Sequence, residues 1–327
     1  GGLTSLRKLL TRLRNSLVYR VTKVLRESPV DLAATVARDT TASILEHSVA
    51  GMARALADAL AADGIGPDDH VLVHTTDGDM YRVLLHLALD GTLARKAPRL
   101  HLVTPYDSGT MPHYAAGLAV DRVVRYLDLL NLIGSSIFLY AEHEALARDL
   151  ASRWGVPVGS QPIPPPTEAL AEPLDRTGPF TIAYLGAAWE EKGFLLLPDI
   201  VDRVLAEQGS KLRFIIQCSP QIVGYTAKIE AAIARLQQHP AGRVRLITQG
   251  QAMRDYYAVL QESDVVLACY DPEKYKVRGS GIAVEALVFG NTLIASPATS
   301  PAEIAGRAAV TAGSIDEIVS RIREILH

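Results

Sequence analysis

Nearly continuous apolar runs alternate with helical patterns along most of this 327-residue sequence, and this alternation constrains its fold more than any other feature. In the second half, the expected strands are FTIAYLG (180–186), KLRFIIQC (211–218), VRLIT (244–248), DVVLACY (264–270) and TLIAS (292–296). Helices are expected near 193–208, 225–238, 251–262, 281–290 and 314–326. Strands that are apolar throughout are buried on both faces, so we predict an α/β fold with parallel sheets covered by helices.

The first half of the chain shows the same alternation less fully. Expected strands there are HVLVHT (70–75), LHLVT (100–104) and SIFLY (136–140). Helices are expected at 80–90, at 142–153 and in the run that stops at Gly64. Residues 1–60 contain no strand pattern followed by a glycine-rich turn, so we expect this half to lack a usual opening strand or to hold only a partial sheet.

Chain length and a proline-rich segment predict two domains. The chain is long for one domain, and residues 156–179 contain seven prolines, which is typical of a stiff connector. We therefore predict an N-terminal Rossmann-like domain at 29–160, a linker at 161–179 and a C-terminal Rossmann-like domain at 180–327. Two such sheets joined by a hinge face each other across a cleft at their strand C-terminal edges, where ligands bind.

Bulk composition indicates a globular protein of ordinary character, with 48% hydrophobic and 21% charged residues. No apolar run approaches the roughly 18 residues of a membrane-spanning helix, and no signal-peptide pattern is present. Cys218 and Cys269 both lie in strand patterns, which favours reduced core thiols over a disulfide. We expect a cytoplasmic protein.

The first 28 residues form a distinct basic segment. Residues 1–26 hold seven Lys or Arg and no acid, and leucines and valines recur at three- and four-residue spacing from Leu3 to Val24. This predicts an amphipathic basic helix at 1–28. It could pack on the body or form a dimer coil, or it could lie on an anionic membrane surface. Nucleic acid is not expected as a partner, because aromatic residues are not interleaved with the basic ones.

Two segments of the second domain combine a strand end, a polar loop and a helix start. In AYLGAAWEEKGF (183–194) the strand ends at Gly186, and Lys192 stands where the next helix opens. A helix start offers unpaired N–H groups and a positive dipole end, so this segment can bind phosphate. Many αβ turns carry a lysine at the same place for no functional reason.

The second segment is KVRGSGIAVEALVFGN (276–291). Gly279, Ser280 and Gly281 let the backbone approach a ligand, and Arg278 could pair with a diphosphate in bidentate fashion. Glu285, one turn into the helix, could accept hydrogen bonds from a ribose diol. It could equally be a first-turn acid that the helix dipole stabilises.

Taken together, these motifs resemble the nucleotide-binding domain of family 4-type glycosyltransferases with the GT-B fold. The resemblance rests on YLG…EKGF…LP, DVVLACYDPEKYKVRGSG and VEALVFGN, and on FLYAEHEALARDLASRWGVPVGSQPIPPP before the linker. It implies a GT-B fold and a nucleoside-diphosphate sugar donor, UDP- or GDP-linked. Lys192 matches the lysine that contacts the diphosphate, and Ser280 and Gly281 match the phosphate loop. Glu285 matches the second glutamate of a Glu-x7-Glu motif, which grips the ribose.

The sequence departs from the family pattern at two places. Val277 stands where the first glutamate of the motif is expected, and Ala187-Ala188 replaces a basic residue after the strand-ending glycine. Either Glu273, Lys274 or Arg278 could substitute for the missing groups. The departures leave a catalytically reduced binding or scaffold protein as an alternative, with an epimerase or a phosphorylase of similar fold as a third.

The remaining candidates follow other strand ends. In the first domain they are His74, Asp77, Tyr106, Asp107 and His113, of which His74 and Asp107, with Arg278, are the catalytic candidates. Gln217 and Gln249 could line a base pocket beside Gly186. The resemblance implies a retaining transfer to a polysaccharide, lipid-linked or protein acceptor, in which the leaving diphosphate assists. No metal is expected, because the sequence contains no His/Cys cluster.

Overall fold

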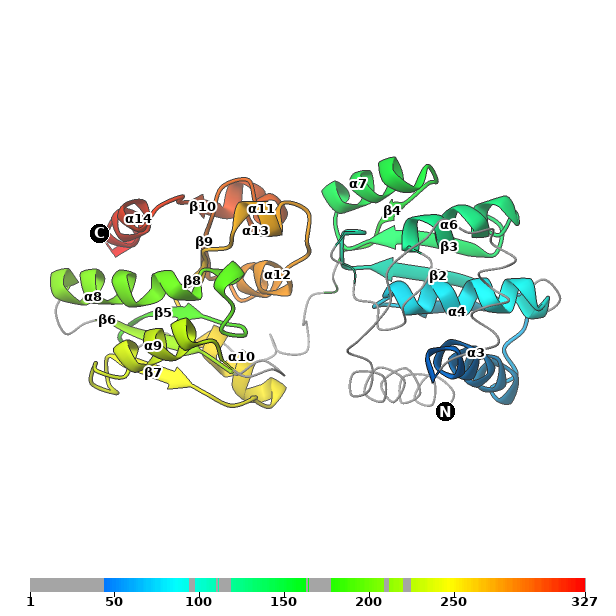
Figure 1. The fold of residues 1–327 in the computed structure, drawn as a ribbon. Coiled ribbons are helices and arrows are strands. Elements are labelled where there is room, and N and C mark those ends of the chain that lie inside the picture. The colour runs from blue at the N-terminus through cyan, green and yellow to red at the C-terminus, as the bar shows by residue number, and fades with distance from the viewer. Residues whose placement is uncertain are drawn as a thin grey trace. The chain divides into compact units, whose positions relative to one another are not determined.

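The computed structural model (Figure 1) describes residues 44–93, 98–109, 111, 119–162, 164, 178–208, 212–219 and 225–326. The basic helix expected at 1–28 and most of the linker expected at 161–179 lie outside these residues. The chain divides into two compact units, residues 1–162 and 163–327. Both are α/β units with parallel sheets, as the alternation predicts.

Unit 1 contains a four-stranded parallel sheet in the order β1-β2-β3-β4. Its elements are α3 (Ile44–Ala62), β1 (His70–Val73), α4 (Gly78–Leu89), β2 (Arg99–Thr104), α6 (Val120–Leu129), β3 (Ile137–Ala141), α7 (Glu144–Trp154) and β4 (Gly159–Ser160). All the strands and helices expected here are confirmed. The two-residue strand β4 was not expected.

The order of strands in unit 1 places its helices on one side of the sheet. Because neighbouring strands follow one another in the chain, right-handed crossovers bring α4, α6 and α7 to the same face. Tyr81, Leu127 and Leu146 from these helices are fully buried, and the Trp154 indole donates to Asp121 Oδ1 at 2.7 Å. In the described part of the chain the opposite face is more open, with Leu72 56% exposed.

Unit 2 contains a six-stranded parallel sheet in the order β10-β9-β8-β5-β6-β7. Its strands are β5 (Phe180–Tyr184), β6 (Leu212–Gln217), β7 (Val244–Ile247), β8 (Val265–Ala268), β9 (Thr292–Ala295) and β10 (Ala309–Thr311). Its helices are α8 (Leu197–Gln208), α9 (Ala227–Leu236), α10 (Met253–Gln261), α11 (Pro272–Tyr275), α12 (Gly281–Val288), α13 (Ser300–Ala305) and α14 (Ile315–Leu326). The strand order reverses between β5 and β8, which is where doubly wound sheets bind ligands.

Helices cover both faces of the unit 2 sheet. One core packs α8, α9 and α14 on residues such as Phe214 and Val265, and the other packs α10, α12 and α13 on residues such as Ile215 and Leu293. Cys218 and Cys269 are buried free thiols in or beside these cores, as expected. In the described residues, no helix is long and apolar enough to cross a membrane.

Every strand and helix expected after residue 180 is present, and α11, α13 and β10 are additional. The helix expected near 193–208 begins differently. Two short 3-10 turns, η2 (Glu190–Lys192) and η3 (Phe194–Leu196), precede α8. Gly193 separates them at φ 75°, a left-handed conformation that interrupts a helix.

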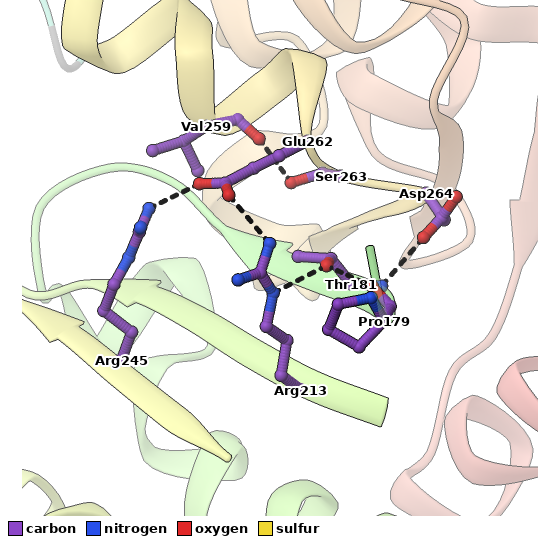
Figure 2. Close-up of polar contacts among 8 residues, drawn as sticks. All are labelled: Pro179, Thr181, Arg213, Arg245, Val259, Glu262, Ser263 and Asp264. Carbon is purple, nitrogen blue, oxygen red and sulfur yellow. Dashed lines mark hydrogen bonds and ion pairs between the residues drawn. The ribbon is translucent and has the colours of Figure 1, made fainter. Parts of the chain in front are cut away.

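The start of the unit 2 sheet is tied together by polar contacts (Figure 2). Asp264 Oδ2 accepts from the Thr181 N–H, and the Asp264 N–H returns to Thr181 O, both at 2.8 Å. Glu262 pairs with Arg213 at 2.7 Å and with Arg245 at 2.6 Å. These bonds join α10 to the beginnings of β5, β6, β7 and β8. The alignment of the strands at this edge determines how their other ends meet.

Candidate functional site

The loops that follow β5 and β8 meet at the carboxyl edge of the unit 2 sheet, beside the reversal of strand order. Gly186, two residues after β5, has a φ of 137° and donates its N–H to Gln217 Oε1 at 3.1 Å. The Gln217 amide nitrogen donates to Ser219 Oγ at 3.3 Å, so both ends of this side chain are bonded within the chain. Gln249 is exposed, and its carbonyl accepts from the Ser219 hydroxyl.

Lys192 and Arg278 lie together over one aromatic ring. Lys192 Nζ is 5.2 Å from the centroid of Trp189, and Arg278 Cζ is 5.4 Å from the same centroid. Lys192 also lies 5.6 Å from the Tyr270 ring, and Arg278 lies 5.0 Å from the Tyr275 ring. Residues 86 positions apart thus form a paired cationic site, which is the arrangement that binds a diphosphate.

One carboxylate, that of Glu191, lies beside the Lys192 and Arg278 cations. Glu191 Oε1 accepts from Arg278 Nη1 at 2.6 Å, and both side chains are partly buried. Lys192 Nζ makes no hydrogen bond with the described residues. Its burial and the neighbouring Arg278 charge lower the pKa of Lys192 to about 8, although the Glu191 charge opposes this shift. Lys192 Nζ therefore has no hydrogen-bond acceptor among the described residues, and an anionic ligand can provide one.

Gly193 explains how these side chains come together. A Cβ atom at this position would lie 2.0 Å from the carbonyl oxygen of Cys269, which no side chain allows. The glycine therefore lets η2 press against the end of β8. The Asp271 N–H then donates to Glu191 O at 2.9 Å. As a result, the η2 residues stand beside the loop that carries Arg278.

The start of α12 faces the same edge. Ser280 is its N-cap in an extended conformation (φ −145°, ψ 106°), but its side chain makes no capping hydrogen bond. The Ser280 hydroxyl instead lies 3.4 Å from Tyr270 Oη. Gly281 opens the helix, so its first-turn N–H groups can donate to an anion. The Ser300 hydroxyl donates to the Arg278 carbonyl, which fixes the loop just before the helix.

Glu285 is held by a tyrosine from α10. Tyr256 Oη donates to Glu285 Oε2 at 2.5 Å, while Glu285 Oε1 has no hydrogen-bond partner in the described residues. Burial raises the pKa of Glu285, and the bond from Tyr256 lowers it. Burial and the adjacent Glu285 charge raise the pKa of Tyr256, which stays protonated as the donor. One carboxylate oxygen is thus oriented and the other is available.

The candidates from unit 1 that the structure describes are His74, Asp77, Tyr106 and Asp107. His74 is exposed after β1, and no hydrogen bond joins it to Asp107. Asp77 caps α4 by accepting from the N–H groups of Asp79 and Met80, and burial raises its pKa. Asp107 accepts from the Gly109 N–H at 2.9 Å. Tyr106 is partly buried, and His113 lies outside the described residues.

Of the three candidates to replace the missing family groups, the structure brings one to Lys192. Arg278 lies in the cluster, whereas Glu273 and Lys274 are exposed on α11. Trp189, Glu191 and Tyr256 contribute to the site but were not predicted from the sequence. The EEK run was a signal for Glu191, because it places a carboxylate next to Lys192 in the sequence.

A cavity of about 850 Å³ adjoins the cluster. Its walls come from η2 and η3, from the end of β8 with α11, and from Ser296 and Pro297 after β9. Trp189, Glu191 and Tyr270 are shared between this cavity and the cationic pair. Ligand pockets for small molecules range from about 300 to 1,000 Å³, so this cavity has the size of a ligand pocket. Lys192, Arg278 and Glu285 are not among its lining residues, so it borders the cationic pair and does not enclose it.

Comparison with solved structures identifies the fold. An E. coli trehalose-6-phosphate protein bound with UDP-2-fluoro glucose is 14% identical, with a TM-score of 0.62 over 86% of this chain and 70% of that chain. The fold is that of GT-B glycosyltransferases. The GT-B likeness extends to an α,α-trehalose 6-phosphate synthase from Burkholderia multivorans, 14% identical, with a TM-score of 0.61 over 96% and 76% of the two chains. No family model and no curated protein matches the sequence.

Lys192→Met tests whether the charge at Lys192 serves binding rather than folding. The folded chain releases this proton near pH 8 and the unfolded chain near 10.5, so the buried charge lowers stability at neutral pH. We expect the variant to be about 1 to 2 kcal/mol more stable than the original chain at pH 7. This difference should shrink between pH 8 and 10.5, as the folded chain loses the charge. Urea unfolding across this pH range measures it, and a variant less stable at pH 7 would contradict a binding role.

Tyr256→Phe tests the orientation of Glu285. Loss of the hydroxyl removes a bond that lowers the pKa of Glu285, so the carboxyl will stay protonated to a higher pH. We expect UDP affinity at pH 7 to fall about fivefold, the equivalent of one hydrogen bond. The acid limb of the binding profile should move to higher pH. Tyr257→Phe, on the same helix, is the matched control, and equal effects of both variants on titration calorimetry would refute the assignment.

Proposed function

We propose that this chain is a glycosyltransferase that uses a nucleoside-diphosphate sugar, as its fold and one site together support. The observation that carries the proposal is the convergence of Lys192 and Arg278 with the open N-terminus of α12, one turn before Glu285. Each part suits a different portion of the nucleotide. The cations and the N–H groups of Ser280 and Gly281 match the diphosphate, and the free oxygen of Glu285 matches the ribose diol.

In this proposal the site works by stabilising the leaving group. As the bond between sugar and diphosphate breaks, negative charge grows on the phosphate oxygens. The α12 amides face that charge from the start of the helix, and Lys192 and Arg278 lie close enough to turn toward it. Transfer with retention, in which the leaving diphosphate assists the acceptor, then needs no strong base from the protein. One solved neighbour is described as transferring glycosyl groups with retention.

A uridine nucleotide is the favoured donor, and a GDP-sugar is the other. The E. coli neighbour is bound with UDP-2-fluoro glucose, and a Burkholderia xenovorans neighbour is described as UDP-forming. The acceptor is a polysaccharide, a lipid-linked intermediate or a protein. We assign it to unit 1, as the domain at 29–160, with His74 and Asp107 as its polar groups. Gly186 and Gln249 then border the donor in the domain at 180–327, beyond the linker at 161–179.

A catalytically reduced nucleotide-binding or scaffold protein is the second candidate. Two departures favour it, since Val277 replaces a glutamate and Ala187 replaces a basic residue. Glu191 also forms an ion pair with Arg278, one of the two cations that would bind a diphosphate. Arg278 favours the enzyme, because it provides a second cation next to Lys192. Membrane contact or dimerisation through residues 1–28 concerns a segment outside the described residues and stays a prediction.

A turnover assay separates the two candidates. We expect the chain to release UDP from UDP-glucose, or GDP from a GDP-sugar, slowly in water and faster with acceptor extracts. Glu285→Ala should lower release at least tenfold, because the ribose loses a charged acceptor. Glu324→Gln, on the surface of α14 where Glu324 pairs with Arg321 at 2.6 Å, is the control and should leave release unchanged. Binding of UDP without any release would favour the scaffold.

A further inference from the structure

Trp189 carries a polar group that the structure leaves without a partner. Its indole nitrogen is buried from solvent, yet it donates a hydrogen bond to no described residue. Buried donors are almost always satisfied, so this exception calls for a physical explanation. The other tryptophan of the chain, Trp154, is bonded to Asp121 at 2.7 Å. Of the two tryptophans, Trp189 is the one whose indole N–H has no partner among the described residues.

The neighbours of Trp189 explain why the N–H is unsatisfied. Lys192 and Arg278, the two cations over its ring, are donors only and can accept nothing. Glu191, the carboxylate beside them, is engaged by Arg278 at 2.6 Å. Glu190 is exposed and pairs with Lys228 at 3.5 Å on α9. The ring is thus surrounded by the donors Lys192 and Arg278, and the two nearby carboxylates are each already paired, so the surroundings suit an anionic ligand.

We infer that Trp189 is a ligand-binding residue whose indole N–H donates to a phosphate oxygen of the nucleoside diphosphate. This inference rests on the proposed function, since it adds a third donor to the Lys192 and Arg278 pair. The phosphate oxygen is the hydrogen-bond acceptor that the described residues do not provide for this N–H. It is a specificity device as well, because a nucleoside without phosphate leaves the N–H unsatisfied.

The backbone of the η2 turn holds the indole ready for this role. The backbone N–H of Trp189 donates to Ala187 O at 2.9 Å, and the Trp189 carbonyl accepts from the backbone N–H of Lys192 at 3.0 Å. The residue also borders the cavity of about 850 Å³, so space for a ligand lies beside the ring. The groups over the ring are long, flexible side chains. A diphosphate that attracts Lys192 and Arg278 draws them from the ring and opens a path to the N–H.

Trp189→Phe tests this directly. The variant keeps an aromatic ring beneath the cations, and it loses the N–H donor together with part of the indole ring. We expect UDP affinity, measured by titration calorimetry, to fall about tenfold, while uridine affinity stays within twofold. The melting temperature should not fall, since no hydrogen bond is lost. Trp154→Phe is the matched control. It should lower the melting temperature, because Asp121 loses its donor, and leave UDP affinity unchanged.

The outcomes separate this inference from the proposed function. If the unaltered chain binds UDP or GDP and Trp189→Phe binds it equally well, the indole N–H contacts no phosphate and only the inference is overturned. If the unaltered chain binds neither nucleotide, the proposed function and the inference are both overturned. In the Trp154→Phe background, Trp189 is the remaining tryptophan. A change in its fluorescence on UDP addition, with none on uridine addition, supports the inference.

Discussion

The close approach of Gly193 to the backbone of Cys269 is the contact on which the candidate site depends. Only a residue without a side chain can lie there, and it does so at a left-handed φ of 75°. The turn seats η2 on the end of β8, so Lys192 and Trp189 reach the loop that carries Arg278. A chain with alanine at this position would have to move η2 outward, and the cations would separate.

The site holds more hydrogen-bond donors than acceptors, and this excess is the reason why we propose an anionic ligand. One carboxylate, Glu191, pairs with Arg278, while Lys192 Nζ and the buried Trp189 indole N–H have no acceptor among the described residues. The described residues at this edge therefore offer more donors than acceptors. Glu285, one turn into α12, is the exception, and it offers an oxygen to hydroxyl groups rather than to phosphate. A ligand with an anionic middle and a diol at one end fits both parts.

Much of this architecture could be predicted from the sequence, because strands buried on both faces leave continuous apolar runs. The positions of Lys192, Ser280 and Glu285 followed from strand ends and helix starts, which are local features. The partners of these residues could not be predicted in the same way. Glu191 and Arg278 are 87 positions apart, and Tyr256 and Glu285 are 29 apart, so their pairing depends on how whole elements pack. The 3-10 turns before α8 were also missed, since they follow from the contact of Gly193 with β8.

A crystal structure of the chain with UDP bound is the most direct test of the central claim. The account predicts phosphate oxygens within hydrogen-bond distance of Lys192, Arg278 and the N–H of Gly281, with the ribose hydroxyls on Glu285. The Arg278 guanidinium should turn from Glu191 toward the phosphate. UDP bound elsewhere on the chain, with the Glu191–Arg278 pair intact and the α12 N-terminus empty, would contradict it.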